Sequence, residues 1–273
     1  MNPDSDSSFG AWQPLTPRGV SQFAAASGWR LFVMLLVFGS IASGSVIWFA
    51  AHAWSPVIHN AIRHLPDGAA LKQGRLEGVE PGILADGKFL SIIVDDSGES
   101  PSGVADVQLK FRKTLADVCS LLGCLSVNYP RDRELDLARR SSEPWWGAWE
   151  PMLLAGLGLA SLLALMISWC ALAGLYFAPV RLLAYFADRQ LNGLGAWKLA
   201  CAAQMPGALV MSSGIVLYGM QALDLIRLGF VFLIHFVVSW VYLAASPLFL
   251  PRLADAPPRD NPFGKKSSAE EPK

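Results

Sequence analysis

Four long runs of apolar residues contain no Asp, Glu, Lys or Arg. A helix needs about 20 mostly apolar residues to cross the hydrocarbon core of a bilayer, which is about 30 Å thick. Every run is at least that long, so we predict four transmembrane helices. The uncharged runs cover residues 31–54, 151–180, 199–223 and 228–251, and the helices that they predict cover 31–54, 151–178, 199–221 and 228–249.

The first run also has one feature of a cleavable signal peptide. Ala51-His52-Ala53 matches the small-x-small pattern of a cleavage site. The run is nevertheless longer than the roughly 7–15 apolar residues of a signal peptide. The segment before it carries the acidic Asp4 and Asp6 where a signal peptide is basic. We therefore expect a retained anchor helix.

The positions of the basic residues predict the orientation. Short cytoplasmic loops are enriched in Lys and Arg, whereas long loops cross the membrane whatever their charge. The connection between the third and fourth helices has only Arg227, so we expect both termini in the cytoplasm and residues 55–148 on the other side. The other basic residues outside 55–148 are Arg18, Arg30, Arg181, Arg189, Lys198, Arg252, Arg259, Lys265, Lys266 and Lys273.

Three segments on the cytoplasmic side have patterns of their own. Residues 1–28 and 252–273 are polar tails that we expect to be disordered. Residues 180–191 combine apolar side chains such as Leu183 with charged ones such as Arg181. This pattern predicts a short amphipathic helix that lies in the membrane interface.

Residues 55–148 have the mixed pattern of a small α+β domain. Residues 57–65 are amphipathic with a helical period, and residues 89–94 are an apolar, β-branched run. Residues 107–111 alternate between apolar and polar, and 125–129 form a further short β-prone run. The predicted fold is therefore a membrane α-helical protein with four transmembrane helices and an α+β extracytoplasmic domain between the first and second.

Two cysteines of this domain are expected to lie close together. Thr114 and Asp117 resemble the capped start of a helix that would end at Gly123. In such a helix Cys119 and Cys124 would occupy two positions that touch. A hairpin with a four-residue loop would instead place the same cysteines opposite each other. Both routes predict a Cys119–Cys124 disulfide, and two buried free thiols remain the alternative.

Five polar residues lie within or beside the predicted helices, where burial in lipid is costly. His235 is near the middle of the fourth helix and Gln204 is in the cytoplasmic third of the third. They are expected to form an interhelical hydrogen bond, with a proton relay or ligand role for His235 as the alternative. Asp224 and Arg227 are three residues apart and can pair, and Glu150 precedes the second helix.

Small residues and a proline predict how the helices pack. Ser40 with Gly44, and Gly156 with Ala160, are four residues apart and would allow close approach of helices. Pro206 should kink the third helix because it removes one hydrogen bond from the ladder.

Composition and motifs do not support catalysis, a cofactor, a metal site or nucleic-acid binding. Lys plus Arg and Asp plus Glu both total 22, so the chain has no general basic field. His52, His59 and His64 lack the spacing of a helical metal site, and no Cys or carboxylate completes a ligand set. Phosphate-binding and nucleophile-elbow motifs are also missing.

Three short segments resemble a known family. They are Leu65-Pro66 with Gln73-Gly74-Arg75-Leu76, the run from Ile92 to Gly98, and Trp197-Lys198 with Met205-Pro206. On these the chain resembles an uncharacterised bacterial multi-pass membrane family labelled maltodextrin-utilisation-associated, whose bundle is similar to that of Yip-type proteins. The resemblance implies that the protein lies in a bacterial inner membrane and that an α+β domain follows its first helix and precedes the remaining bundle.

The most direct functional hypothesis is a non-enzymatic scaffold or regulatory partner that acts through the extracytoplasmic domain. Its partner would be another protein or further copies of this chain, in addition to the lipid bilayer. A component of a membrane transport system is the alternative, based on Pro206, Gln204 and His235. A membrane enzyme would have only His235 and Glu150 as candidate catalytic groups.

Overall fold

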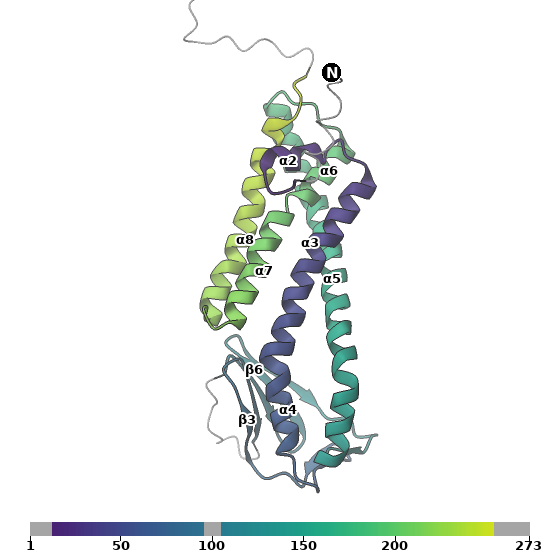
Figure 1. Ribbon diagram of the computed structural model, residues 1–273, viewed down its shortest axis with the longest axis vertical. Coiled ribbons are helices and arrows are strands. Elements are labelled where there is room, and N and C mark those ends of the chain that lie inside the picture. The colour runs from purple at the N-terminus through teal and green to yellow at the C-terminus, as the bar shows by residue number, and fades with distance from the viewer. Residues whose placement is uncertain (1–12, 96–104, 254–273) are drawn as a thin grey trace, which may run out of the picture.

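The computed structural model describes residues 13–95 and 105–253. Within them, four helices are long and apolar enough to cross a membrane, and each covers most or all of one of the four runs predicted above. Figure 1 shows these helices side by side, with a β-sheet domain at one end, the sheet end, and the beginning and end of the described chain at the other, the terminal end. The four helices are Gly28–Arg63, Arg139–Phe186, Gly193–Gly219 and Leu225–Phe249.

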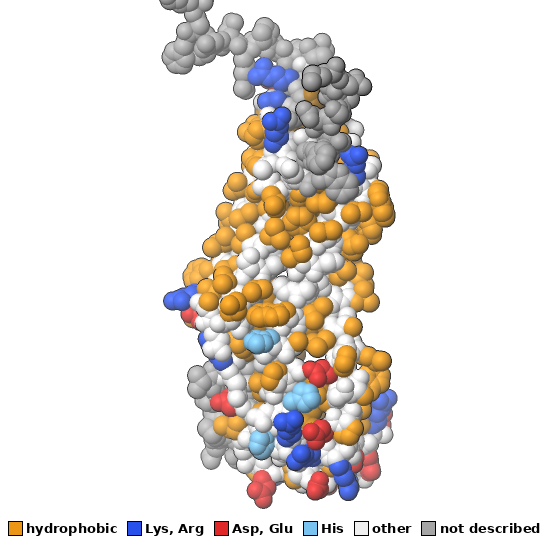
Figure 2. All heavy atoms as spheres, in the orientation of Figure 1, with side chains coloured by type: hydrophobic (Ala, Val, Ile, Leu, Met, Phe, Trp, Pro, Cys, Tyr) orange, Lys and Arg blue, Asp and Glu red, His pale blue; other side chains and the backbone are white. Residues whose placement is uncertain are grey.

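Side-chain chemistry changes along the molecule. In Figure 2 hydrophobic side chains cover the middle of the bundle, Lys and Arg gather at the terminal end, and both signs of charge occur at the sheet end. An apolar band between two polar ends is the distribution that a bilayer favours.

The first long helix runs without a break into the sheet domain. It consists of α3 (Gly28–Phe49), the π-helical turn η1 (Ala50–Trp54) and α4 (Ser55–Arg63). Pro56 has no N–H to donate to the carbonyl four residues earlier, and its ring crowds that carbonyl. The ladder widens just before it, where the Ser55 N–H bonds to the Ala50 carbonyl five residues back. The amphipathic helix predicted over 57–65 is therefore a continuation of the first long helix.

The second long helix extends far beyond a bilayer's thickness. Helix α5 (Arg139–Phe186) has 48 residues, which corresponds to about 72 Å at 1.5 Å per residue. It continues through Pro179, so the separate interfacial helix predicted over 180–191 is wrong. Packing explains the continuity, because Val180 and Ala184 are both buried in the bundle.

The third predicted span consists of two helices. Helix α6 (Gly193–Ala202) begins at Asn192, whose side chain accepts the Gly195 N–H at 2.6 Å, and α7 comprises Met205–Gly219. Pro206 lies in the first turn of α7, and the predicted kink is an interruption of the helix just before it. Close packing of α7 against α8 (Leu225–Ala245) follows, because a Cβ at Gly207 would collide with the His235 carbonyl.

The predicted disorder of residues 1–28 is wrong for residues 13–28. The Thr16 hydroxyl caps α2 (Pro17–Gln22), and Val20 and Phe23 are completely buried in the terminal end of the bundle. The sequence pattern did not predict order here, because Val20 and Phe23 are isolated apolar residues among small and polar ones. Residues 1–12 of the predicted tail lie outside the described residues.

The C-terminal tail is also ordered at its start. After the 3₁₀ turn η2 (Ser246–Phe249), the Gln190 N–H donates to the Pro251 carbonyl and the Leu253 N–H donates to the Asp188 carbonyl. These bonds hold the chain against the loop before α6. The remaining predicted tail, residues 254–273, is not among the described residues.

The sheet domain contains a five-stranded sheet in the order β3-β4-β5-β6-β7, in which only β4 and β5 are parallel. Helix α4 covers one face, where Ala61 packs with Leu90 and Ile92. A second, three-stranded sheet has the order β2-β1-β8. The strands are β1 (Ala70–Lys72), β2 (Arg75–Glu77), β3 (Gly82–Asp86), β4 (Leu90–Val94), β5 (Val107–Phe111), β6 (Leu115–Ser120), β7 (Gly123–Asn128) and β8 (Leu135–Asp136).

Strands β4, β5 and β7 lie where the sequence predicted strands, but the predicted helix from Thr114 to Gly123 is wrong. That segment is β6 and the turn of a β6–β7 hairpin. Asp117, expected at a helix start, is buried and forms an ion pair with Arg112 at 2.8 Å. It also accepts a hydrogen bond from Ser126 at 2.6 Å. Cross-strand partners thus replace the local capping that the sequence suggested.

Candidate functional site

The β6–β7 hairpin is closed by a disulfide between Cys119 and Cys124. The two residues are direct partners in the strand register, which corresponds to the hairpin alternative of the sequence analysis. Gly123 has a φ of +116°, a left-handed conformation that suits the tight turn. Leu121 and Leu122 form the tip, and the Leu122 side chain is 98% exposed.

Strand β7 is an edge of the five-stranded sheet, and every one of its residues is exposed. Leu125 pairs with Val118 of β6, which pairs with Leu109 of β5. Laterally paired residues point to the same face of a sheet, and Leu109 packs under α4. The apolar face that α4 covers therefore continues to an open edge, where Leu125 is 68% and Val127 is 53% exposed.

The opposite edge of the sheet is protected. Strand β3 has an irregularity between Ile83 and Ala85, where its register with β4 shifts. Ala85 packs with Ala61 of α4. Bulges and covering helices are two ways in which proteins block the edges of sheets, and β7 has neither among the residues that the structure describes.

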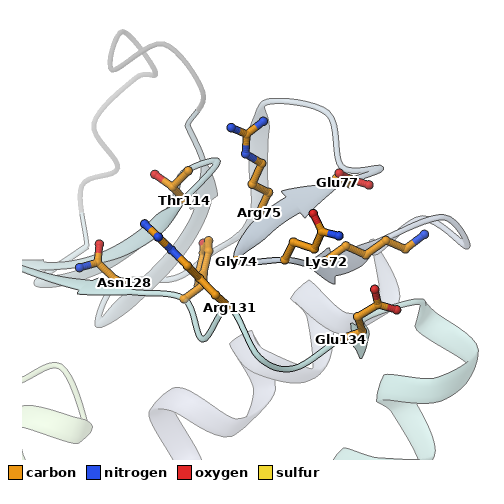
Figure 3. Close-up of a pocket in the computed structure, with 10 residues that line it drawn as sticks. Lys72, Gly74, Arg75, Glu77, Thr114, Asn128, Arg131 and Glu134 are labelled. Atoms are coloured by element: carbon orange, nitrogen blue, oxygen red, sulfur yellow. The ribbon is translucent and has the colours of Figure 1, made fainter.

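A polar cleft of about 1170 Å³ lies at the end of β7 (Figure 3). Arg75 and Arg131 lie toward Thr114 in this view, whereas Glu77 and Glu134 lie toward the opposite side. The local structure that forms it is the β1–β2 turn, where Gln73 has φ +49° and Gly74 has φ +75°. A Cβ at Gly74 would come within 2.9 Å of the Arg131 side chain, so glycine lets the arginine lie over the turn.

Tyr129 lines the cleft and has a buried hydroxyl without a partner. Its oxygen is buried and forms no hydrogen bond in the structure. Burial, and to a smaller extent the charge of Asp117, raises the pKa of Tyr129 to about 12. The hydroxyl is thus neutral and buried in the wall of a cleft that Arg75 and Arg131 also line. Sequence reasoning missed this cleft because its residues come from separate segments, although Gly74 is a recognisable turn residue.

Tyr218 fixes the sheet domain against the bundle. It is the penultimate residue of α7, and its hydroxyl donates to the Asp106 carboxylate at 2.6 Å. Its ring also packs edge-on against Phe89 and stacks on Phe49, with ring centroids 4.8 and 5.3 Å apart. Leu225, at the start of α8, lies in the same apolar cluster. Sequence analysis did not identify these residues because their contacts join distant segments.

Glu150 links the two helices that enter the sheet domain. Its carboxylate accepts a hydrogen bond from Ser55 and contacts His59 Nε2 at 3.0 Å. The His59 ring meets Trp146 edge-on at 6.3 Å. Glu150 therefore joins α4 to α5 and does not meet His235, the other residue considered for catalysis. No group of three or more metal-ligating residues occurs among the described residues.

Gln204 and His235 line one cavity of about 500 Å³ inside the bundle. The expected hydrogen bond between them is absent. His235 Nδ1 instead contacts the Phe232 carbonyl, while Gln204 Nε2 is buried without a partner. Gln204 and His235 therefore line the same cavity but form no hydrogen bond with each other.

Asp224 and Arg227 pair as expected at the start of α8. The Asp224 carboxylate accepts the Arg227 N–H at 2.7 Å and lies 3.5 Å from the Arg227 guanidinium. Both side chains are exposed, so the pair caps the helix and contributes little as an ion pair.

Comparisons of the chain with protein-family models, curated proteins and solved structures find no match.

Proposed function

We propose that the four long helices cross a bacterial cytoplasmic membrane, with both termini in the cytoplasm and the sheet domain outside. The apolar band of the bundle supports this location (Figure 2). The orientation is supported by Arg181, Arg189 and Lys198, which follow the second span at the terminal end, opposite Arg227. Protease added to spheroplasts should cut the sheet domain and spare a C-terminal epitope tag. Cleavage of the tag with the sheet domain left intact would indicate the opposite orientation.

In this membrane the protein acts as a non-enzymatic scaffold or regulatory partner, and its sheet domain binds an extended segment of another protein along β7. The observation that carries this proposal is the open β7 edge. An edge strand offers unpaired N–H and C=O groups to a strand from a partner. Leu125 and Val127 add apolar contact area, which gives the pairing a hydrophobic contribution.

The polar cleft favours a partner with an acidic group near one end of its bound segment. A strand paired with β7 would pass Asn128 and reach the side of the cleft where Arg75 and Arg131 lie (Figure 3). Arginine pairs well with carboxylates. The combination specifies a segment of alternating apolar residues with Asp or Glu at the end that reaches the cleft.

A photo-crosslinking amino acid at position 127 tests the proposal in intact membranes. We expect an adduct with one protein, lost when Leu125→Lys places a charge on the edge. Position 83 on β3 is the matched control, because Ile83 is similarly exposed at the protected edge. Equal adducts from both positions, or an adduct insensitive to Leu125→Lys, would contradict the proposal. An adduct of twice the chain mass would identify a second copy as the occupant instead.

A component of a membrane transport system is the second candidate function. The bundle cavity with Gln204 and His235 favours it, because polar groups inside a helical bundle often mark substrate paths. Swelling of proteoliposomes in isotonic sugar, amino-acid and salt solutions would test it. Swelling that requires the protein supports transport, and its absence with all three solute classes argues against it.

A further inference from the structure

The bundle cavity is enclosed by four helices and opens sideways. Helices α3, α5, α7 and α8 all contribute to its lining. Ala164 and Ser168 of α5 and Phe232 of α8 line it and are also exposed on the surface of the bundle. The opening therefore lies between α5 and α8. Ala164 and His235 are near the midpoints of residues 151–178 and of α8, so the opening would face the middle of the bilayer.

Gln204 is the feature of this cavity that calls for a ligand. The residue is only 4% exposed, and its Nε2 has no hydrogen-bond partner in the described structure. Buried amide donors in proteins are nearly always paired. The interruption between α6 and α7 places this side chain in the cavity wall.

Other polar groups of the lining do not supply that partner. The hydroxyls of Ser161, Ser168 and Ser212 donate to carbonyls of their own helices. His235 contacts the Phe232 carbonyl through Nδ1, which leaves Nε2 for another contact. The cavity thus has two polar positions, Gln204 and His235, in mostly apolar surroundings.

Aromatic rings flank the second polar position. The His235 ring lies 3.9 Å from the Phe236 ring and 5.0 Å from that of Phe232, measured between centroids. Trp169 of α5 is buried at the cavity wall. Rings of this kind suit a flat or unsaturated apolar group. The volume of about 500 Å³ lies within the range of about 300–1,000 Å³ that small-molecule sites occupy.

We propose that this cavity binds a neutral, membrane-dissolved lipid with a carbonyl oxygen. The Gln204 amide donates a hydrogen bond to that oxygen, and the apolar part of the lipid fills the space toward Trp169 and Phe232. A phospholipid fits less well, because its charged headgroup holds its ester carbonyls at the membrane surface, whereas an uncharged lipid can bring a carbonyl toward the bilayer centre, which the opening faces. Two neutral sources share the required chemistry, a quinone and an acylglycerol. The inference rests on the membrane location and is independent of partner binding at β7.

Binding of two probes to the full-length protein in phosphatidylcholine nanodiscs tests the inference. Decylubiquinone represents quinones and dioleoylglycerol represents acylglycerols, and saturable binding above that of empty nanodiscs is measured for each. We expect one of them to bind, and which one binds identifies the source. Gln204→Leu should weaken binding at least about tenfold, because the hydrogen bond is lost inside an apolar site.

Matched variants separate this role from general effects on folding. Gln190→Leu makes the same chemical change at an exposed residue of the terminal end and should bind like the wild type. Ser168→Trp should block the opening at an exposed position without touching Gln204. Thermal unfolding without probe checks folding, and Gln204→Leu should be at least as stable as wild type because it removes an unpaired donor.

Several results would overturn the inference. They are absence of saturable binding of both probes to the wild type, equal binding by Gln204→Leu and Gln190→Leu, and binding unaffected by Ser168→Trp. Leu125→Lys should leave probe binding unchanged, so the failure of either proposal can be distinguished from that of the other.

Discussion

Tyr218 of α7 donates a hydrogen bond of 2.6 Å to the Asp106 carboxylate, next to the start of β5. This bond connects residues 112 positions apart and joins the helical bundle to the sheet domain. The Phe49 and Phe89 rings pack around it. The sheet domain is therefore held at the bundle by a polar contact within an aromatic cluster and by the two helices that enter it.

Tyr218→Phe should loosen this junction while keeping the aromatic packing. A hydrogen bond to a charged group contributes roughly 1.5–3 kcal/mol, so we expect a loss of about that size in the stability of the docked state. Hydrogen–deuterium exchange should increase in residues 105–111 with little change in β6. Phe232→Leu, a change far from the junction, is the control. Unchanged exchange in Tyr218→Phe would show that the aromatic cluster alone holds the domain.

The Cys119–Cys124 disulfide should be present in protein isolated without reductant. It closes a short loop, for which the chain-entropy model gives about 2 kcal/mol of stabilisation. Replacing both cysteines with Ser should therefore lower the unfolding temperature of the sheet domain but preserve the bundle. Mass spectrometry of unreduced peptides checks the bond, and rapid alkylation of both cysteines without reductant would contradict it.

The sequence predicted what depends on length and local pattern. Long uncharged runs were sufficient for the four candidate spans, and alternation was sufficient for β5. Continuity of the helices was not predictable in the same way. Separate helices were predicted over 57–65 and 180–191, yet both segments continue a long helix through Pro56 and Pro179, because tertiary packing outweighs the local cost of the proline.

Close helix contacts show a second limit. The four-residue spacing of small residues predicted close approach of helices at Gly44 and Gly156. A Cβ at either glycine would meet nothing within 4 Å. The helices approach at neighbouring glycines instead: a Cβ at Gly158 would collide with Ile47, and one at Gly39 with Leu162. The rotation of each helix about its axis decides which small residue is used, and that rotation depends on long-range packing.

The candidate sites were predictable only in part. Gln204 and His235 were identified because polar residues in apolar helices are unusual, but their separation across a cavity depends on how α7 and α8 pack. The cleft near Tyr129 combines turns and strands that are distant in sequence. The Cys119–Cys124 pair was predictable because its residues are only five apart.

Stability should fall in alkaline solution because of Tyr129. Its pKa in the folded protein is about 12, raised by burial and by Asp117, whereas an unfolded tyrosine has a pKa of about 10. The stability that neutral Tyr129 contributes is fully present below pH 10. It is lost as the pH rises from about 10 to 12, because Tyr129 releases its proton in the unfolded chain at a lower pH than in the folded protein. Tyr129→Phe should reduce this loss in denaturant unfolding at pH 9 and 11.5. An identical loss in the variant would assign it to other groups.

The tip of the β6–β7 hairpin should touch the membrane surface. Leu121 and Leu225 line the same pocket, so the tip lies beside the start of α8. If α8 enters the bilayer there, the exposed Leu122 reaches the interfacial layer, where burial of a leucine side chain is favourable by roughly 1.5–3 kcal/mol. A fluorescent amino acid at position 122 should be quenched by lipids that carry a nitroxide near the headgroup. The same probe at Arg133, between β7 and β8, is the control and should remain unquenched. Equal fluorescence at position 122 with and without the nitroxide lipid would place the tip in water and leave Leu122 available to a protein partner.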